Sequence, residues 1–126
     1  MDIDFDENNN RAVYIEIKGM DYERAAKKIC CELYDAGVLK EEIDTTDWDV
    51  LARAIKKRLL DDKEERIPYL LLLLDEADTF IESCTEVNFK PFDALNEIQN
   101  IGMDRIKLVI AGIHNIVRFM RDAALT

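Results

Sequence analysis

The sequence contains little from which a metal-stabilised or disulfide-stabilised protein could be built. It has one histidine, His114, and three cysteines, Cys30, Cys31 and Cys84. No two cysteines have the C-x-x-C spacing, so the zinc-finger classes are excluded. The odd cysteine count and the lack of a signal-peptide pattern indicate reduced thiols and a cytoplasmic location.

Long apolar runs and an excess of basic residues are also missing. The longest apolar run covers residues 69–74 and is far too short to cross a membrane. Acidic residues outnumber basic ones by 27 to 17, which gives a net charge of −10. Because phosphate backbones attract basic surfaces, we expect no nucleic-acid partner, and we expect no membrane association. The balance of 48% hydrophobic and 35% charged residues is that of a globular domain.

Three segments have the patterns of β-strands. Residues 11–18 alternate apolar and polar side chains, and residues 106–111 form a short apolar run rich in β-branched residues. Residues 69–74 read YLLLLL, and leucine by itself favours a helix. This run is short, follows Pro68 and ends in Asp-Glu, so we predict a central strand that is buried on both faces of a sheet.

Helical patterns lie between these segments. Asp21 is placed to cap a helix that Gly37 ends, and a second helix is predicted to begin near Thr46. Pro91 opens a third helix that Gly102 ends. The order is therefore strand, two helices, strand, helix, strand. It predicts an α/β fold with a three-stranded parallel sheet flanked by helices.

The other segments have weaker patterns. Residues 1–10 are acidic and rich in asparagine, and we expect them to form a disordered leader before one domain of residues 11–126. Residues 78–89 predict a short helical turn and a loop. Residues 112–126 predict a loop followed by a helical tail.

Two adjacent carboxylates, Asp75 and Glu76, follow the predicted central strand. Ligands bind open parallel sheets at the carboxyl ends of the strands. Asp75 is suited to hold Mg²⁺ there, usually through its water shell, and Glu76 to orient and deprotonate an attacking water. The structural alternative for this pair is a solvated turn. For Asp78, a role at the start of a helix is favoured over a catalytic one.

An apolar strand that ends in Asp-Glu resembles the Walker B motif of P-loop ATPases. The segment KLVIAGIHN, about thirty residues later, resembles the sensor-1 strand of the AAA+ and STAND branches of that family. The amino-acid sequence of residues 75–119 is similar to that of bacterial STAND-like regulatory ATPases. The resemblance as a whole covers residues 11–121. It implies that His114 or Asn115 contacts the γ-phosphate or the attacking water; the alternative for His114 is an ordinary loop residue.

The P-loop motif G-x-x-x-x-G-K-[ST] of this family is missing, because no glycine of the chain precedes a lysine. The resemblance therefore implies the Walker B and sensor-1 half of an ATPase core. In the parent protein it implies ATP and Mg²⁺ as cofactors, with ATP binding coupled to a regulatory switch. The chain alone is expected to bind neither tightly and to hydrolyse ATP poorly. The alternative is a non-catalytic protein-interaction module that kept the fold and lost the site.

The same family implies an order of strands in which residues 69–74 lie in the middle. The P-loop strand would pair with residues 106–111, so its absence is expected to leave that strand edge open. An unpaired apolar edge is a template for association, which predicts a homodimer or larger homo-oligomer, or contact with the rest of the ATPase. The alternative is that residues 113–126 fold back and cover the edge.

Overall fold

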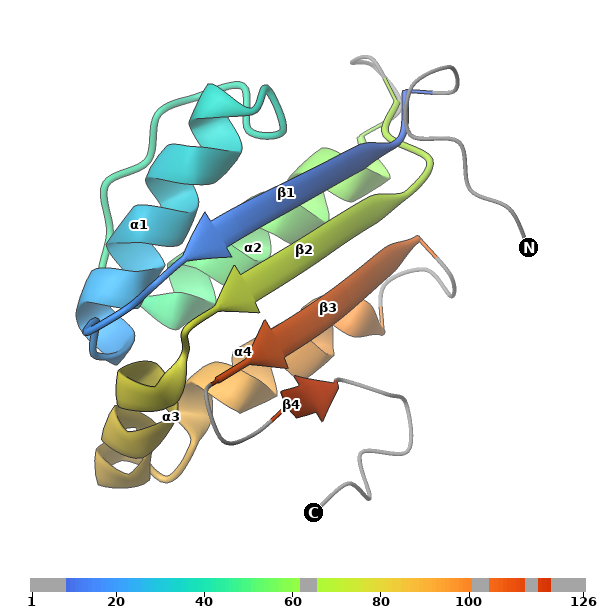
Figure 1. Ribbon diagram of the computed structural model, residues 1–126. Coiled ribbons are helices and arrows are strands. Elements are labelled where there is room, and N and C mark those ends of the chain that lie inside the picture. The colour runs from blue at the N-terminus through green and yellow to red at the C-terminus, as the bar shows by residue number, and fades with distance from the viewer. Residues whose placement is uncertain (1–8, 62–65, 101–104, 113–115, 119–126) are drawn as a thin grey trace.

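The computed structural model describes residues 9–61, 66–100, 105–112 and 116–118. One sheet has the order β1-β2-β3-β4 (Figure 1). β1 (Arg11–Glu16), β2 (Leu70–Asp75) and β3 (Ile106–Ala111) are parallel, and β4 (Ile116–Arg118) is antiparallel to β3. The prediction of an α/β fold with three parallel strands is confirmed, and so is the central place of β2.

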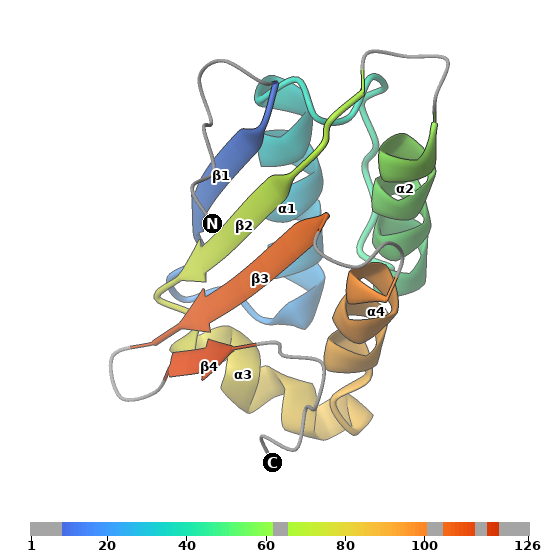
Figure 2. The same cartoon turned by 90° about the vertical axis from the view of Figure 1, so that its right-hand side faces the viewer.

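The long helices lie together on one face of this sheet (Figures 1 and 2). They are α1 (Tyr22–Asp35), α2 (Trp48–Leu60) and α4 (Lys90–Gln99), while the short α3 (Asp78–Cys84) and a 3₁₀ turn (Thr85–Val87) follow β2. Strand order from β1 to β3 never reverses. Right-handed crossovers between parallel strands that advance in one direction must all lie on the same face.

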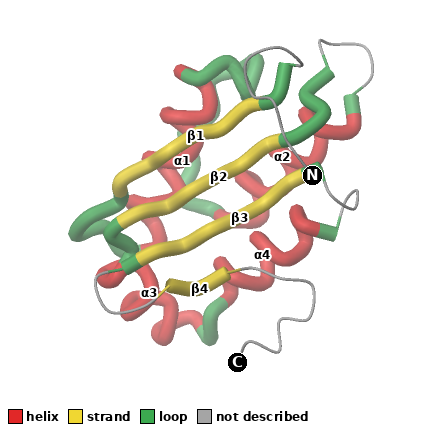
Figure 3. Tube along the Cα trace, turned by 45° about the vertical axis from the view of Figure 1, so that its right-hand side comes forward, coloured by secondary structure: helices red, strands yellow, loops and turns green. Residues whose placement is uncertain are grey.

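One-sided coverage gives β1, β2 and β3 an alternating burial pattern. In β2, Leu70, Leu72 and Leu74 are buried, whereas Leu71 and Leu73 are only half-buried. The prediction that this strand is buried on both faces is therefore wrong for the described residues. We call the side away from the helices the open face; Figure 3 shows the sheet from this side. Its residues are Ala12, Tyr14, Glu16, Leu71, Leu73, Asp75, Lys107, Val109 and Ala111.

The hydrophobic core lies between the sheet and the helices. Phe80 of α3 is fully buried in it, with its ring centroid 5.3 Å from that of Trp48 and 5.7 Å from that of Phe92. The indole N–H of Trp48 donates to the Tyr22 carbonyl at 2.7 Å. Trp48 is therefore a core anchor that ties the start of α2 to the start of α1.

The ends of α1 and α2 follow ordinary capping chemistry. Asp21 caps α1 by accepting from the Arg24 N–H at 2.9 Å, and Gly37 after the helix has a φ of +78°. Helix α2 begins at Trp48, close to Thr46 as predicted, and its cap is Asp47, whose side chain accepts from the Asp49 N–H at 2.8 Å. Helix α4 begins at Lys90 and has Pro91 in its first turn, as predicted. The predicted stop at residue 102 lies outside the described residues.

The outer edge of β3 is partly paired. Strand β4 pairs with Val109, Ile110 and Ala111, so the expectation that the whole edge is open is wrong. A strand also stands at 116–118, where a loop and a helical tail were predicted. This short strand has little pattern of its own, because pairing with β3 creates it. Folding back of the segment after β3 was the alternative prediction, and it holds for these three residues.

At the other end, residues 1–8 of the predicted leader lie outside the described residues. Asn9 and Asn10 lie inside them; the Asn9 side chain donates to the Arg66 carbonyl, and Asn10 is buried. Within the described part of the chain, no helix has both the length and the apolar character needed to span a membrane.

One-sided burial predicts unequal costs for neighbouring leucines of β2. Leu72→Ala removes a fully buried side chain and should lower the free energy of unfolding by about 2–5 kcal/mol. Leu73→Ala, on the open face, should cost less than half as much. Denaturant unfolding at low micromolar protein concentration compares the two variants. Equal losses would mean that β2 is covered on both faces in solution.

Candidate functional site

The candidate site lies where the parallel strands end. Asp75 is the last residue of β2, opposite Glu16 of β1, and Glu76 begins the connection to α3. The backbone of this connection is held on both sides. The Ile17 N–H donates to the Asp75 carbonyl and the Ala77 N–H donates to the Ala111 carbonyl, each at 2.9 Å.

Asp75 is already engaged by hydrogen bonds within the chain. The Tyr14 hydroxyl donates to its Oδ2, and the backbone N–H of Glu76 donates to its Oδ1 at 2.8 Å. Hydrogen bonds to the ionised form stabilise it, so the Tyr14 hydroxyl and then the Glu76 N–H lower the pKa of Asp75. The same bond to Asp75 raises the pKa of Tyr14 to about 12. Asp75 is therefore an ionised acceptor at neutral pH.

Glu76 lies in a strained and crowded place. Its φ is +54°, in the left-handed region that residues with a Cβ rarely adopt. The neighbouring Glu16 carboxyl group, followed by desolvation, raises the pKa of Glu76. Backbone strain and a raised carboxyl pKa both concentrate at functional sites, and a raised pKa makes a carboxylate a better proton acceptor at neutral pH.

Asp78 and Gly112 meet next to this pair. A Cβ added at Gly112 would lie 2.5 Å from Oδ1 of Asp78, so only glycine fits there without a shift. Asp78 is the first residue of α3, in agreement with its predicted place at the start of a helix. The close approach brings the beginning of α3 against the segment that follows β3. The predicted sensor residues His114 and Asn115 lie in that segment, outside the described residues.

Three residues of this site were not predicted: Tyr14, Glu16 and Gly112. In the sequence, Tyr14 and Glu16 are polar positions of the alternating segment 11–18, and only the register of β1 against β2 places them beside Asp75. Strand alternation did put both on one face, which was the available signal. Nothing in the sequence pattern indicated that Gly112 faces Asp78.

The described residues offer limited ligation for a metal. Among them, no group of three or more His, Cys, Asp or Glu side chains could hold an ion. Asp75 supplies one carboxylate, which still has acceptor capacity beside its two hydrogen bonds. This fits Mg²⁺ that is held mainly by water and phosphate oxygens, and it does not fit a cage made by protein side chains.

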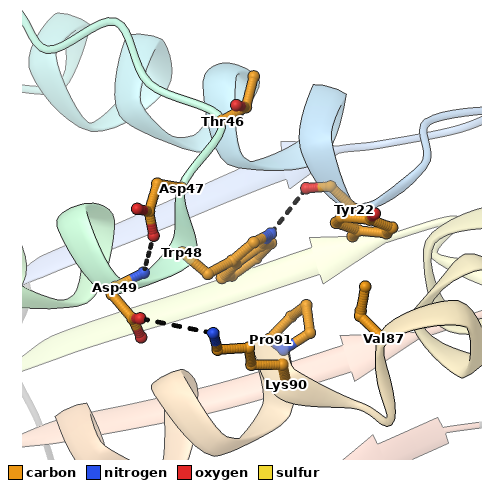
Figure 4. Close-up of a pocket in the computed structure, with 8 residues that line it drawn as sticks. All are labelled: Tyr22, Thr46, Asp47, Trp48, Asp49, Val87, Lys90 and Pro91. Carbon is orange, nitrogen blue, oxygen red and sulfur yellow. Dashed lines mark hydrogen bonds and ion pairs between the residues drawn. The ribbon is translucent and has the colours of Figure 1, made fainter.

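Two hollows of the described surface lie elsewhere. One, of about 140 Å³, lies between the starts of α1, α2 and α4 (Figure 4) and is lined by Tyr22, Thr46, Asp47, Trp48, Asp49, Val87, Lys90 and Pro91. The other, of about 290 Å³, is lined by Leu39, Lys40, Glu41, Ile43, Ala54, Lys57, Arg58 and Asp61. Neither of these two hollows includes Asp75 or Glu76.

Comparison of the chain with protein-family models, with curated proteins and with solved structures finds no match in any of the three.

The pKa of Glu76 predicts how stability depends on pH. The folded chain holds the Glu76 proton more tightly than the unfolded chain does. Stability is therefore lost as pH rises from the ordinary pKa of 4.5 through the raised one. Glutamine cannot ionise, so Glu76→Gln should become progressively more stable than the wild type across this range. Urea unfolding from about pH 4.5 to 7.5 measures the difference.

Glu82→Gln, on the exposed surface of α3, controls for the general loss of one negative charge. If the stability gain of Glu76→Gln did not grow with pH, the two carboxyl groups would not interact in solution.

The hydrogen bond between Tyr14 and Asp75 predicts a separate titration effect. Because this bond is the first cause of the lowered pKa of Asp75, Tyr14→Phe should raise that pKa toward the ordinary 3.8. Carboxyl ¹³C NMR titration of Asp75 reads it directly, with Tyr34→Phe, on the exposed side of α1, as the matched variant. An unchanged Asp75 titration in Tyr14→Phe would show that the bond is not populated in solution.

Proposed function

We propose that the chain is the Walker B and sensor-1 part of an AAA+/STAND-like ATP-binding regulatory protein. In this proposal Asp75 supplies a carboxylate to the hydrated Mg²⁺ of Mg-ATP, and Glu76 orients the attacking water and accepts its proton. Bound Mg²⁺ would neutralise phosphate charge during hydrolysis. The chain alone, without a P-loop, is expected to hydrolyse ATP poorly or not at all.

The observation that carries the proposal is the place of the two carboxylates. They stand at the carboxyl end of the middle strand of three parallel strands, which is the edge where ligands bind such sheets. The two are also differentiated, because hydrogen bonds lower the pKa of Asp75 while Glu16 raises that of Glu76. One stable anion for a cation and one carboxylate of higher proton affinity suit the two proposed roles.

A second candidate, a non-catalytic interaction module, is favoured by two different observations. Tyr14 already donates to the Asp75 oxygen that a ligand shell would use, and β4 pairs with the β3 edge at which the resemblance expects the P-loop strand. A domain that lost ATP chemistry could keep Asp75 as the acceptor of a structural hydrogen bond. A P-loop motif encoded immediately upstream would favour the ATPase fragment over this second candidate.

The proposal predicts weak binding of Mg-ATP at Asp75. Without P-loop N–H groups and lysine, affinity should be no better than about millimolar, or roughly 4 kcal/mol. Mn²⁺ accepts the same octahedral oxygen shell as Mg²⁺ and broadens nearby NMR signals. At millimolar Mn-ATP, amide signals of residues 75–78 should broaden selectively, and Asp75→Asn should remove the effect.

Asp44→Asn, an exposed loop carboxylate, is the matched control and should leave the broadening unchanged. Broadening that spreads over many acidic residues, or that survives Asp75→Asn, would contradict the proposed role of Asp75. Submicromolar binding of Mg-ATP would contradict the expected need for a P-loop. Any turnover in a preparation should persist in Glu76→Gln, because it would come from a contaminating ATPase.

A further inference from the structure

The open face has an apolar middle row, unlike charges at two corners and the carboxylate of Asp75 beside Glu16. Its middle row consists of Tyr14, Leu73 and Val109, which the register places side by side on β1, β2 and β3. Tyr14 is 58% exposed, and its hydroxyl reaches Asp75 on the next strand, so its ring extends across the face. Exposed aromatic side chains in an apolar patch are typical of interface centres.

The charged corners lie on one diagonal. Lys107 and Glu16 are both exposed; Lys107 lies near the amino end of β3 and Glu16 at the carboxyl end of β1. The opposite diagonal runs from Ala12 through Leu73 to Ala111. The face therefore has small side chains at two corners and unlike charges at the other two.

We propose that this open face binds a second copy of the chain, with the two sheets crossing at nearly 90°. A two-fold axis along the diagonal from Ala12 to Ala111 brings Lys107 of each copy to Glu16 of the other. Leu73 then meets its own copy at the centre. Crossing near 90° is one of the two angles at which sheets pack face to face. Symmetry makes the contact isologous, so it closes at two chains.

Charge complementarity selects this occupant. The register places Lys107 and Glu16 at opposite corners of the face, so each copy offers the other one ammonium group and one carboxylate at matching places. A face that carried charges of only one sign would repel a second copy. On this face, the two-fold rotation brings each positive corner to the negative corner of the other copy. Parallel sheets are ordinarily covered on both faces, and the described helices cover only one here.

The size of the face sets the strength of the dimer. Three strands of six residues span about 14 Å by 20 Å, or roughly 280 Å² per copy, which is below the range of stable specific interfaces and suits a weak, transient contact. We therefore expect a dimer that forms at high micromolar concentration and dissociates at low micromolar concentration. Pairs at the rim fix the orientation of the copies more than they add affinity.

Sedimentation velocity over about 5–500 μM tests the proposal. Wild-type protein should shift from monomer to dimer, and Leu73→Lys should remain monomeric. Leu60→Lys is the matched control, because Leu60 is 53% exposed on α2, which lies on the helical side. This control should dimerise as the wild type does.

Charge reversal gives a second measurement that does not depend on the folding of Leu73→Lys. Lys107→Glu and Glu16→Lys should each weaken the dimer by about tenfold, since each creates two like-charged pairs. The double variant restores both pairs with reversed sign and should recover wild-type affinity within about threefold. A monomer at all concentrations, dimerisation by Leu73→Lys, or a double variant weaker than either single one would overturn the proposal.

Discussion

Pairing of β2 between two parallel neighbours, in an order that never reverses, is the constraint on which the rest of this molecule depends. Each connection from one parallel strand to the next must cross over on the same side, so α1, α2 and α4 gather on one face. The same pairing brings the ends of β1, β2 and β3 to one edge. The burial of one face of the sheet and the position of the carboxylates at the carboxyl ends of the strands thus both follow from this topology.

That topology explains which parts of the fold the sequence could predict. The apolar runs at 69–74 and 106–111 predicted the positions of β2 and β3 to within one residue. Apolar runs as short as these form few structures other than buried strands. The five consecutive leucines could not reveal their own alternation. Leu71 and Leu73 have the same side chain as Leu70 and Leu72, and only the coverage of the sheet distinguishes them.

The sequence predicted the two carboxylates of the site but not the residues that contact them. Asp75 and Glu76 could be singled out because they end an apolar strand, which is a local pattern. Tyr14 is 61 positions away from Asp75, and its contact depends on a register that one residue of slippage would destroy. The left-handed backbone of Glu76 was equally hidden, since glutamate carries no preference for that conformation.

The carboxyl edge has to satisfy demands that oppose one another. Three acidic side chains, Glu16, Asp75 and Glu76, lie together in a chain whose net charge is −10. Asp75 is stabilised as an anion by the Tyr14 hydroxyl and the Glu76 N–H, which both donate to it. Glu16 and Glu76 remain next to each other, so any cation that reaches them lowers the free energy of the folded chain. The two proposals name two such cations, a hydrated Mg²⁺ at the strand ends and the lysine of a second copy on the open face. Because either cation would relieve the repulsion between Glu16 and Glu76, the same pair of carboxylates would favour both proposed contacts.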